Sequence, residues 1–310
     1  MYFLILMRSR HSCWNHPRCA TNSTYPLRIY LCNHLPAAQL RAHRETGQTA
    51  SMPFASPTEF AKESIAAVQE YSILCARSLA ALFTPPIYLG DIFSQMDSIG
   101  FGSLPITILA GFFTGCVLAL QSATSLQQFG AISMTGRLVS LSMMKELGPV
   151  LTGLMVSGRN ASGMASELGS MKVTEQIDAM RALGVDPIRK LVTPRVSATV
   201  FMLFFLTILS DAVGVAGGGL VSVFMLGLNG TSYFHSTYRA LVYGDVVQGM
   251  IKPIFFGFII STVGCYFGMS TKGGTQGVGK ATTQAVVVSS VFIIVVDFLI
   301  SRLTIGIFGR

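Results

Sequence analysis

Long apolar runs restrict the fold of this chain more than any other feature. Five stretches, 103–121, 132–158, 196–228, 251–269 and 284–308, match the roughly 20 apolar residues that a helix needs to cross a bilayer. Only 12% of the 310 residues are charged, against about 25% in a typical soluble domain. Because lipid cannot satisfy backbone polar groups, such segments cross as helices. The sequence therefore predicts an all-α integral membrane protein with five transmembrane helices.

The first 51 residues differ from the rest of the chain. Residues 1–44 hold six Arg and no acidic residue, so they supply most of the net charge of +8, and this charge is no evidence for nucleic-acid binding. Such composition is typical of organelle targeting segments, whereas the apolar start before the basic residues reverses the order of a secretory signal. We favour a misassigned start with Met52 as the true initiator, and we treat 1–51 as an N-terminal extension outside the domain formed by 52–310. This extension also contains five possible zinc ligands, Cys13, His16, Cys19, Cys32 and His34. Their spacing matches no standard zinc site, so we expect no metal site.

Residues 57–83 mix apolar and charged side chains before the first span. Apolar residues recur at helical spacing between charged ones: Phe60, Ile65, Val68, Leu74, Leu79 and Leu82 alternate with Lys62, Glu63, Glu70 and Arg77. This amphipathic pattern indicates a helix lying in the membrane interface, and Pro85 and Pro86 would end it. A sixth span over 72–93 is the alternative, although it is charged and broken by proline.

The stretch from Lys145 to Arg195 holds 7 of the 22 Lys and Arg and 5 of the 14 Asp and Glu. Because unpaired charges are costly in hydrocarbon, it must turn into the protein or leave the bilayer. The loop 159–195 is basic, as is the loop with Lys272 and Lys280, and a five-span topology places both on one side. Basic loops are typically cytoplasmic, so we expect this side to face the cytoplasm or a plastid stroma.

Lys145 and Glu146 lie inside the second predicted span. Intramembrane charges usually face a protein interior, a cavity or a partner. Neighbouring residues of a helix diverge by about 100°, so Glu146 can line a polar path while Lys145 is anchored elsewhere. A structural cap or an interhelical hydrogen bond is the alternative for this pair. Pro149 is expected to kink the helix.

The segment from Met171 to Leu183 reads as one short amphipathic helix. Its apolar stripe is Val173, Ile177, Met180 and Leu183, and Lys172, Glu175, Asp178 and Arg181 cover its other faces. Gly184 would end it. At 13 residues it is too short to span a membrane and suits docking into a partner's groove, with packing against its own chain as the alternative.

Enzymatic motifs are weak in this sequence. Residues 274–281 nearly spell a phosphate-binding loop, but Ala281 stands where Ser or Thr would hold Mg²⁺, so we expect a flexible loop. A membrane-embedded enzyme would have to rely on Glu146, Asp211 and Asp297. For both aspartates we favour buried hydrogen bonding or pairing with Arg302.

Several motifs in fixed order resemble the MlaE (YrbE) family of ABC transporter permeases. They are Glu146-Leu-Gly-Pro-Val, Ser157-Gly-Arg, Ala165-Ser-Glu-Leu-Gly, Met171-Lys-Val-Thr-Glu-Gln-Ile-Asp, Gly184-Val-Asp-Pro-Ile, Thr193-Pro-Arg, Gly279-Lys-Ala-Thr-Thr-Gln-Ala-Val-Val and Asp297-Phe. The similarity covers about residues 57–310. Lys145 departs from the pattern, since many members carry Arg there.

This resemblance implies an N-terminal interfacial helix, five spans and a homodimer. It implies a separate cytoplasmic ABC ATPase that binds ATP, so the chain itself would need no cofactor, and an external MCE-domain lipid-binding partner. The ATPase would dock on a coupling helix with Glu175, Ile177, Asp178, Met180 and Arg181. Glu146, with Lys145 beside it, would lie at the cavity for a phospholipid. The expected location is the bacterial inner membrane, or alternatively the chloroplast inner envelope. A secondary transporter and a lipid-modifying membrane enzyme remain the competing functions.

Overall fold

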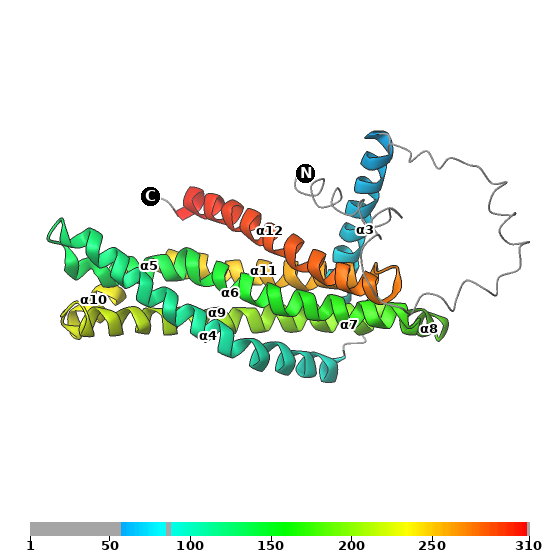
Figure 1. Cartoon of the computed structure of the whole chain (residues 1–310), viewed down its shortest axis with the longest axis horizontal. Helices are drawn as coiled ribbons and strands as arrows, with labels where there is room; N and C mark the ends of the chain where they lie inside the picture. Colours follow the sequence, from blue (N-terminus) through cyan, green and yellow to red (C-terminus); the bar gives the residue numbers. More distant parts are fainter. Residues whose placement is uncertain (1–56, 85–87, 309–310) are drawn as a thin grey trace, which may run out of the picture. The chain divides into compact units, whose positions relative to one another are not determined.

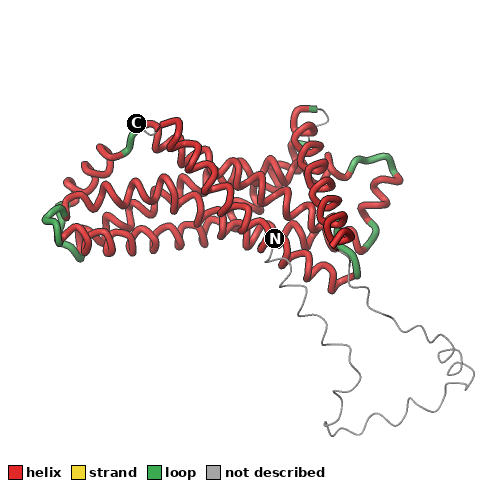
Figure 2. The backbone as a smooth tube through the Cα atoms, turned by 90° about the horizontal axis from the view of Figure 1, so that it is seen from above, coloured by secondary structure: helices red, strands yellow, loops and turns green. Residues whose placement is uncertain are grey.

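The computed structural model describes residues 57–84 and 88–308, and every regular element in these ranges is a helix (Figure 2). The prediction of an all-α protein is confirmed. Residues 60–310 form one compact unit, to which the packing described below belongs. The expectations for residues 1–51, including the five zinc-ligand candidates, and for Pro85 and Pro86 fall outside the described residues.

The helices follow one another along the chain with short connections (Figure 1). They are α3 (Pro57–Phe83), α4 (Leu89–Gln127), the 3₁₀ turn η2 (Ile132–Met134), α5 (Thr135–Ser142), the π-helix η3 (Met143–Leu147), α6 (Gly148–Val156), the π-helix η4 (Ser157–Ala161), α7 (Ser162–Val173), α8 (Gln176–Ala182), the π-helix η5 (Ile188–Val192), α9 (Thr193–Phe224), α10 (Gly230–Ala240), α11 (Tyr243–Met269) and α12 (Gly274–Phe308).

Five helical segments in the described part of the chain are long and apolar enough to cross a membrane. They are Ile65–Leu82, Leu89–Gln127, Ile188–Phe224, Tyr243–Met269 and Gly274–Thr304. Four of them overlap the predicted spans 103–121, 196–228, 251–269 and 284–308. The chain is thus a multi-pass membrane protein, as predicted.

The fifth segment is not the one that the sequence pattern indicated. The predicted span 132–158 does form helix, continuous from Thr135 to Val173, but Lys145 and Glu146 lower its hydropathy and it is absent from the five. Residues Ile65–Leu82 of α3 qualify instead by length and composition. The interfacial position expected for α3 therefore stays a prediction.

Small residues bring the long helices into close contact, as the two GxxxG patterns indicated. A Cβ atom placed on Gly115 of α4 would lie 1.8 Å from the carbonyl oxygen of Gly214 on α9. In the same way, Gly264 of α11 packs against the backbone of Ala161 in η4, and Gly268 against the backbone of Ala165 in α7. Contact between backbones increases dispersion attraction, which drives helix association where no hydrophobic effect operates.

The connections gather at two ends of this unit (Figure 1). At one end α10 packs on α5, and Thr237 donates a hydrogen bond to the carbonyl of Gly136 (3.2 Å). At the other end Gly169 of α7 lies against Thr271 and Val278 beside the α11–α12 turn. The two basic connections, around 174–187 and 270–273, therefore share one end, as the five-span topology predicted.

Two segments expected to be loops are helical. The stretch 159–195 is largely α7, α8 and η5, and the long helix continues through Arg159, which donates to Ser103 Oγ (3.1 Å) and so has a partner on α4. The glycine-rich stretch 274–281 is the first part of α12. The turn before it uses positive φ at Gly273 and Gly274, after which the chain is free to form helix.

Candidate functional site

A buried lysine is the centre of the charged residues inside the helical unit. The side chain of Lys252 on α11 is fully inaccessible to solvent. Its Nζ lies 2.7 Å from Glu146 Oε2, 2.8 Å from Asp297 Oδ1 and 2.8 Å from the Lys145 carbonyl oxygen. An ammonium group has three N–H donors, and three oxygens surround this one. A fully buried lysine persists only with such partners, so these contacts hold α11, α12 and η3 together.

The backbone around Pro149 creates one of these three contacts. In an α-helix the carbonyl of Lys145 would accept from the N–H of residue 149, but proline has no N–H. The lysine side chain from α11 donates to this free carbonyl instead. The same turn is the π-helix η3, a form that is frequent at functional sites. The helix before Pro149 is thus a short π-helix in which Lys252 donates to the Lys145 carbonyl, while the kink expected at Pro149 stays a prediction.

The charges on α11 also separate the two neighbouring side chains of η3. Lys145 Nζ pairs at 2.6 Å with Asp245, in the first turn of α11, while Glu146 points to Lys252. Gly249 lies between these two α11 residues, and a Cβ atom there would be 2.0 Å from the Met144 carbonyl oxygen. A glycine is therefore required for η3 and α11 to approach this closely. Lys145 and Glu146 thus point to different partners, as expected for neighbouring residues of a helix, while their roles stay predictions.

Glu146 is the part of this ion cluster that opens outward. Its side chain is 44% exposed, against 18% for Asp297 and none for Lys252. Ser301 of α12 donates to its Oε1 at 3.1 Å, so one carboxylate edge is held while the rest stays accessible. With all five side chains charged, the cluster of Lys145, Glu146, Asp245, Lys252 and Asp297 carries one net negative charge. It can therefore present a fixed polar surface to a charged or zwitterionic group.

The sequence singles out Lys145, Glu146 and Asp297 as charged residues within predicted spans, but it does not draw attention to Lys252 at the centre of the cluster. Asp297 is paired, as expected, but with Lys252 and not with Arg302, whose side chain is exposed. Lys252 was overlooked because it stands at the edge of an apolar run, where a lysine ordinarily extends to the interface. Asp245 could have drawn attention to Lys252, because it lies seven residues earlier and therefore on the same face of the helix. Asp211 belongs elsewhere, in a separate cavity on α9.

The predicted coupling helix is shorter and more internally bound than expected. Glu175 adopts a left-handed conformation (φ 60°), which ends α7 and makes α8 a separate helix of seven residues. Ile177 is completely buried and Met180 is partly buried, so the middle of the apolar stripe packs against its own chain. The two ends of the stripe are exposed, Val173 to 37% and Leu183 to 81%.

Ion pairs and a terminal turn fix the position of α8. Asp178 accepts from Lys172 of α7 (2.7 Å) and pairs with Arg181 (3.3 Å). The hydrogen bond from Lys172 lowers the pKa of the Asp178 carboxyl below its usual value. At the other end Gly184 has φ 78°, and Val185 N–H bonds to the Met180 carbonyl at 3.0 Å, so the predicted glycine stop is confirmed.

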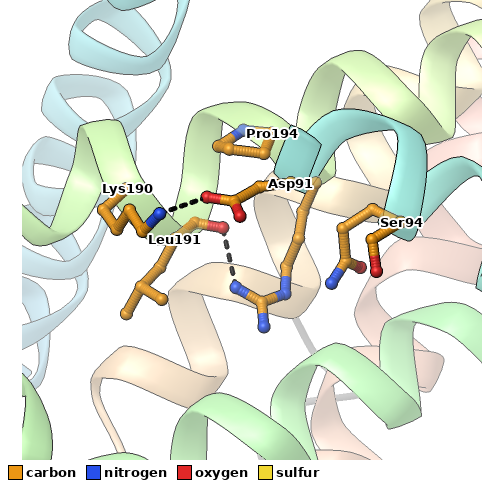
Figure 3. A pocket seen from close by; sticks show the side chains of 7 residues that line it. Asp91, Ser94, Lys190, Leu191 and Pro194 are labelled. Carbon is orange, nitrogen blue, oxygen red and sulfur yellow. Dashed lines mark hydrogen bonds and ion pairs between the residues drawn. The ribbon is translucent and has the colours of Figure 1, made fainter. Parts of the chain in front are cut away.

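The chain returns to α9 through a second charged junction (Figure 3). Lys190 of η5 pairs with Asp91 of α4 and lies 4.2 Å from the centre of the Tyr88 ring. Arg195, buried at 4% exposure, donates to the Leu191 carbonyl (2.7 Å) and pairs with Glu167 of α7 (2.8 Å). These contacts join the turn after α8 to α4, α7 and α9, so a displacement of α8 would reach several long helices.

The described residues form neither a site for a metal ion nor a site for a nucleotide. Within residues 57–84 and 88–308 no group of three His, Cys, Asp or Glu is placed to hold a metal ion. The near match to a phosphate-binding loop is helical, so its glycines do not form the cradle of amides that such a site uses. That the chain itself binds no cofactor stays a prediction.

Comparison with known proteins agrees with this architecture. A family model described as "Permease MlaE" matches residues 92–303. A probable ABC transporter permease protein of Rickettsia felis is 45% identical over 236 residues, which cover 76% of this chain and 91% of that protein. The chloroplastic protein TRIGALACTOSYLDIACYLGLYCEROL 1 of Arabidopsis thaliana is 36% identical, over 82% of this chain and 72% of that protein.

The intermembrane phospholipid transport system permease protein MlaE of Haemophilus influenzae is also 36% identical, over 68% of this chain and 82% of its own length. The Rickettsia and Haemophilus relatives are named as permeases and not as enzymes. The region that the family model matches contains η3, the ion cluster, α8 and the junction at Arg195. The chain belongs to the MlaE permease family and is a membrane-spanning permease subunit of the ABC transporter type.

Proposed function

We propose that this permease moves phospholipid between two membranes and that the Lys252 ion cluster forms part of the lipid's route. The observation that carries the proposal is a fully buried lysine whose partner Glu146 is 44% exposed in the middle of an apolar helical unit. Buried charges in membrane helices usually mark a substrate pathway. The Haemophilus relative, an intermembrane phospholipid transport system permease protein, supports phospholipid as the substrate class.

Glu146 is the proposed contact for the polar part of the lipid, with Lys145 fixing the neighbouring turn. The half-exposed carboxylate suits a headgroup that carries a positive charge, while apolar helix surfaces nearby suit acyl chains. Because Lys252 and Ser301 hold the carboxylate, its position does not depend on bound lipid. A prepositioned group lowers the ordering cost of binding.

The energy is proposed to come from a separate ATPase subunit that contacts the end of α8. The predicted docking residues are Glu175, Ile177, Asp178, Met180 and Arg181. Of these, Ile177 is buried, and Asp178 and Arg181 form an ion pair with each other. We therefore assign the direct apolar contact to Leu183, and a supporting role to the others, which keep α8 in place.

The remaining parts of the assembly are proposed from the family resemblance. They are a homodimer, an external MCE-domain lipid-binding partner, and a location in the bacterial inner membrane. The 45% identity to a Rickettsia protein favours this location over the chloroplast inner envelope, for which the Arabidopsis relative is the argument.

Co-purification of the permease with its ATPase subunit, followed by mass spectrometry of the retained lipids, tests the proposal. We expect an ATPase subunit and phospholipid in the parent complex, and loss of the ATPase in Leu183→Asp. Tyr238→Asp is the matched control, because Tyr238 is also 81% exposed but lies on α10 at the opposite end. Stable folding without an ATPase or phospholipid would overturn the proposal, and equal ATPase recovery in both variants would overturn the Leu183 contact.

A further inference from the structure

A second polar group lies inside the membrane-spanning part of the protein, apart from the Lys252 cluster. Asp211 of α9 is 7% exposed, and its Oδ1 atom is buried without a hydrogen-bond partner among the described residues. The carboxyl presses against Gly148, where a Cβ atom would meet Oδ1 at 1.5 Å. An unpartnered acceptor in this setting is unfavourable, so a donor from outside the chain would stabilise it.

Asp211 also lines an apolar cavity of about 360 Å³ between α9, α10, α11 and η3. Most of its lining is apolar and includes Met144, Phe204, Ala212, Val246 and Met250. The volume lies at the low end of the roughly 300–1,000 Å³ of ligand pockets. At about 30 Å³ per water-sized group it holds roughly a dozen such groups, enough for much of one acyl chain but not for two.

Neighbouring donors are already engaged. Thr207 donates to the carbonyl of Leu203 (2.8 Å) and Thr237 to that of Gly136 (3.2 Å), so neither hydroxyl proton is available to Asp211. The lysines of η3 and α11 pair with other carboxylates. The cavity thus combines apolar walls with the carboxyl of Asp211, of which the Oδ1 atom has no hydrogen-bond partner among the described residues.

We propose that this Asp211 cavity binds a single apolar chain whose end presents a hydroxyl or ammonium donor to Asp211. The chemical class is a single-chain amphiphile, such as a lysophospholipid with a free glycerol hydroxyl or a long-chain amine. A bound chain would touch Met144, the residue next to Lys145, and the carboxyl already contacts the backbone of Gly148. The cavity therefore adjoins the π-helix that carries Glu146 without including that residue.

Photoaffinity labelling of the full-length chain in nanodiscs tests this site directly. Three probes share one diazirine-bearing chain: lysophosphatidylcholine, its 2-O-methyl ether, which has no donor, and the corresponding long-chain ammonium. Labelled peptides are mapped by mass spectrometry. We expect the hydroxyl probe to label peptides around Met144 and Met250 about tenfold more than the methyl ether, the factor that corresponds to a hydrogen bond worth about 1.4 kcal/mol.

Two sets of substitutions test the role of the Asp211 carboxyl and the role of the cavity volume independently. Asp211→Leu removes the acceptor and should abolish the preference for the hydroxyl probe, whereas Asp211→Asn keeps an acceptor without charge and should lose only the ammonium probe. Ala212→Trp fills the cavity and should prevent labelling, and Leu209→Trp, on the same helix but outside the lining, should not. Equal labelling by the methyl ether, or unchanged labelling of Ala212→Trp, would overturn the site. Because binding is read without transport, either result leaves the proposed role of Glu146 untouched.

Discussion

Replacing Lys252 with methionine removes the cation that holds the ion cluster together. Glu146 Oε2 and Asp297 Oδ1 both lie within 2.8 Å of the same Nζ atom and hence within about 5.5 Å of each other. At an effective dielectric constant of ~20, two negative charges at that separation repel by about 3 kcal/mol. Breaking a buried ion pair by removing one partner typically costs about 3–5 kcal/mol, in agreement with this figure.

Thermal unfolding of the purified permease measures this effect. At ~2–4 °C per kcal/mol for a chain of this size, Lys252→Met should lower the Tm by roughly 10 °C. The triple variant Lys252→Met, Glu146→Gln, Asp297→Asn leaves no unpaired charge and should recover most of that loss, because buried ion pairs contribute little relative to neutral replacements. A Tm of Lys252→Met equal to that of the parent, or no recovery in the triple variant, would refute the proposed charge balance.

Three further predictions concern backbone contacts and α8. Gly115→Ala should destabilise the α4–α9 contact by about 1–3 kcal/mol, whereas Gly158→Ala, with open space around it, should not; urea unfolding distinguishes them. Glu175→Gly should stabilise the protein by about 1 kcal/mol, because glycine adopts φ 60° without strain, and a lower Tm would contradict this. Since Lys172 lowers the pKa of Asp178, the stability that this contact adds is present above the ordinary carboxyl pKa and is lost as pH falls through the lowered value. Amide hydrogen exchange in α8 should therefore become faster as the pH falls through this range. An exchange protection of α8 that does not change with pH would exclude the effect.

The fold was predictable because its main determinants are local in sequence. Apolar length identified four of the five qualifying spans, and the spacing of Gly111 and Gly115 identified a face that packs against α9. Charge asymmetry placed the two basic connections at one end. The helix from Thr135 to Val173 falls outside the five qualifying segments because Lys145 and Glu146 lower its hydropathy, so its crossing of the membrane stays a prediction.

The site depended on contacts that sequence order does not reveal. Glu146 and Lys252 are 106 residues apart, and only the packing of η3 on α11 brings them together. Periodicity from 171 to 183 was consistent with one helix, but it did not encode the left-handed turn at Glu175 that divides it. The burial of Ile177 likewise follows from the direction in which α8 leaves α7, which no local pattern specifies.

ATP-driven phospholipid transfer by the reconstituted complex tests the role of the ion cluster most directly. The comparison is between the parent permease and the triple variant Lys252→Met, Glu146→Gln, Asp297→Asn, each first checked for folding and ATPase assembly. We predict that the variant assembles and hydrolyses ATP but transfers phospholipid at least tenfold more slowly, because the charges that face the lipid are gone. Transfer by the assembled variant at the parent rate would contradict a place for this cluster on the lipid's route.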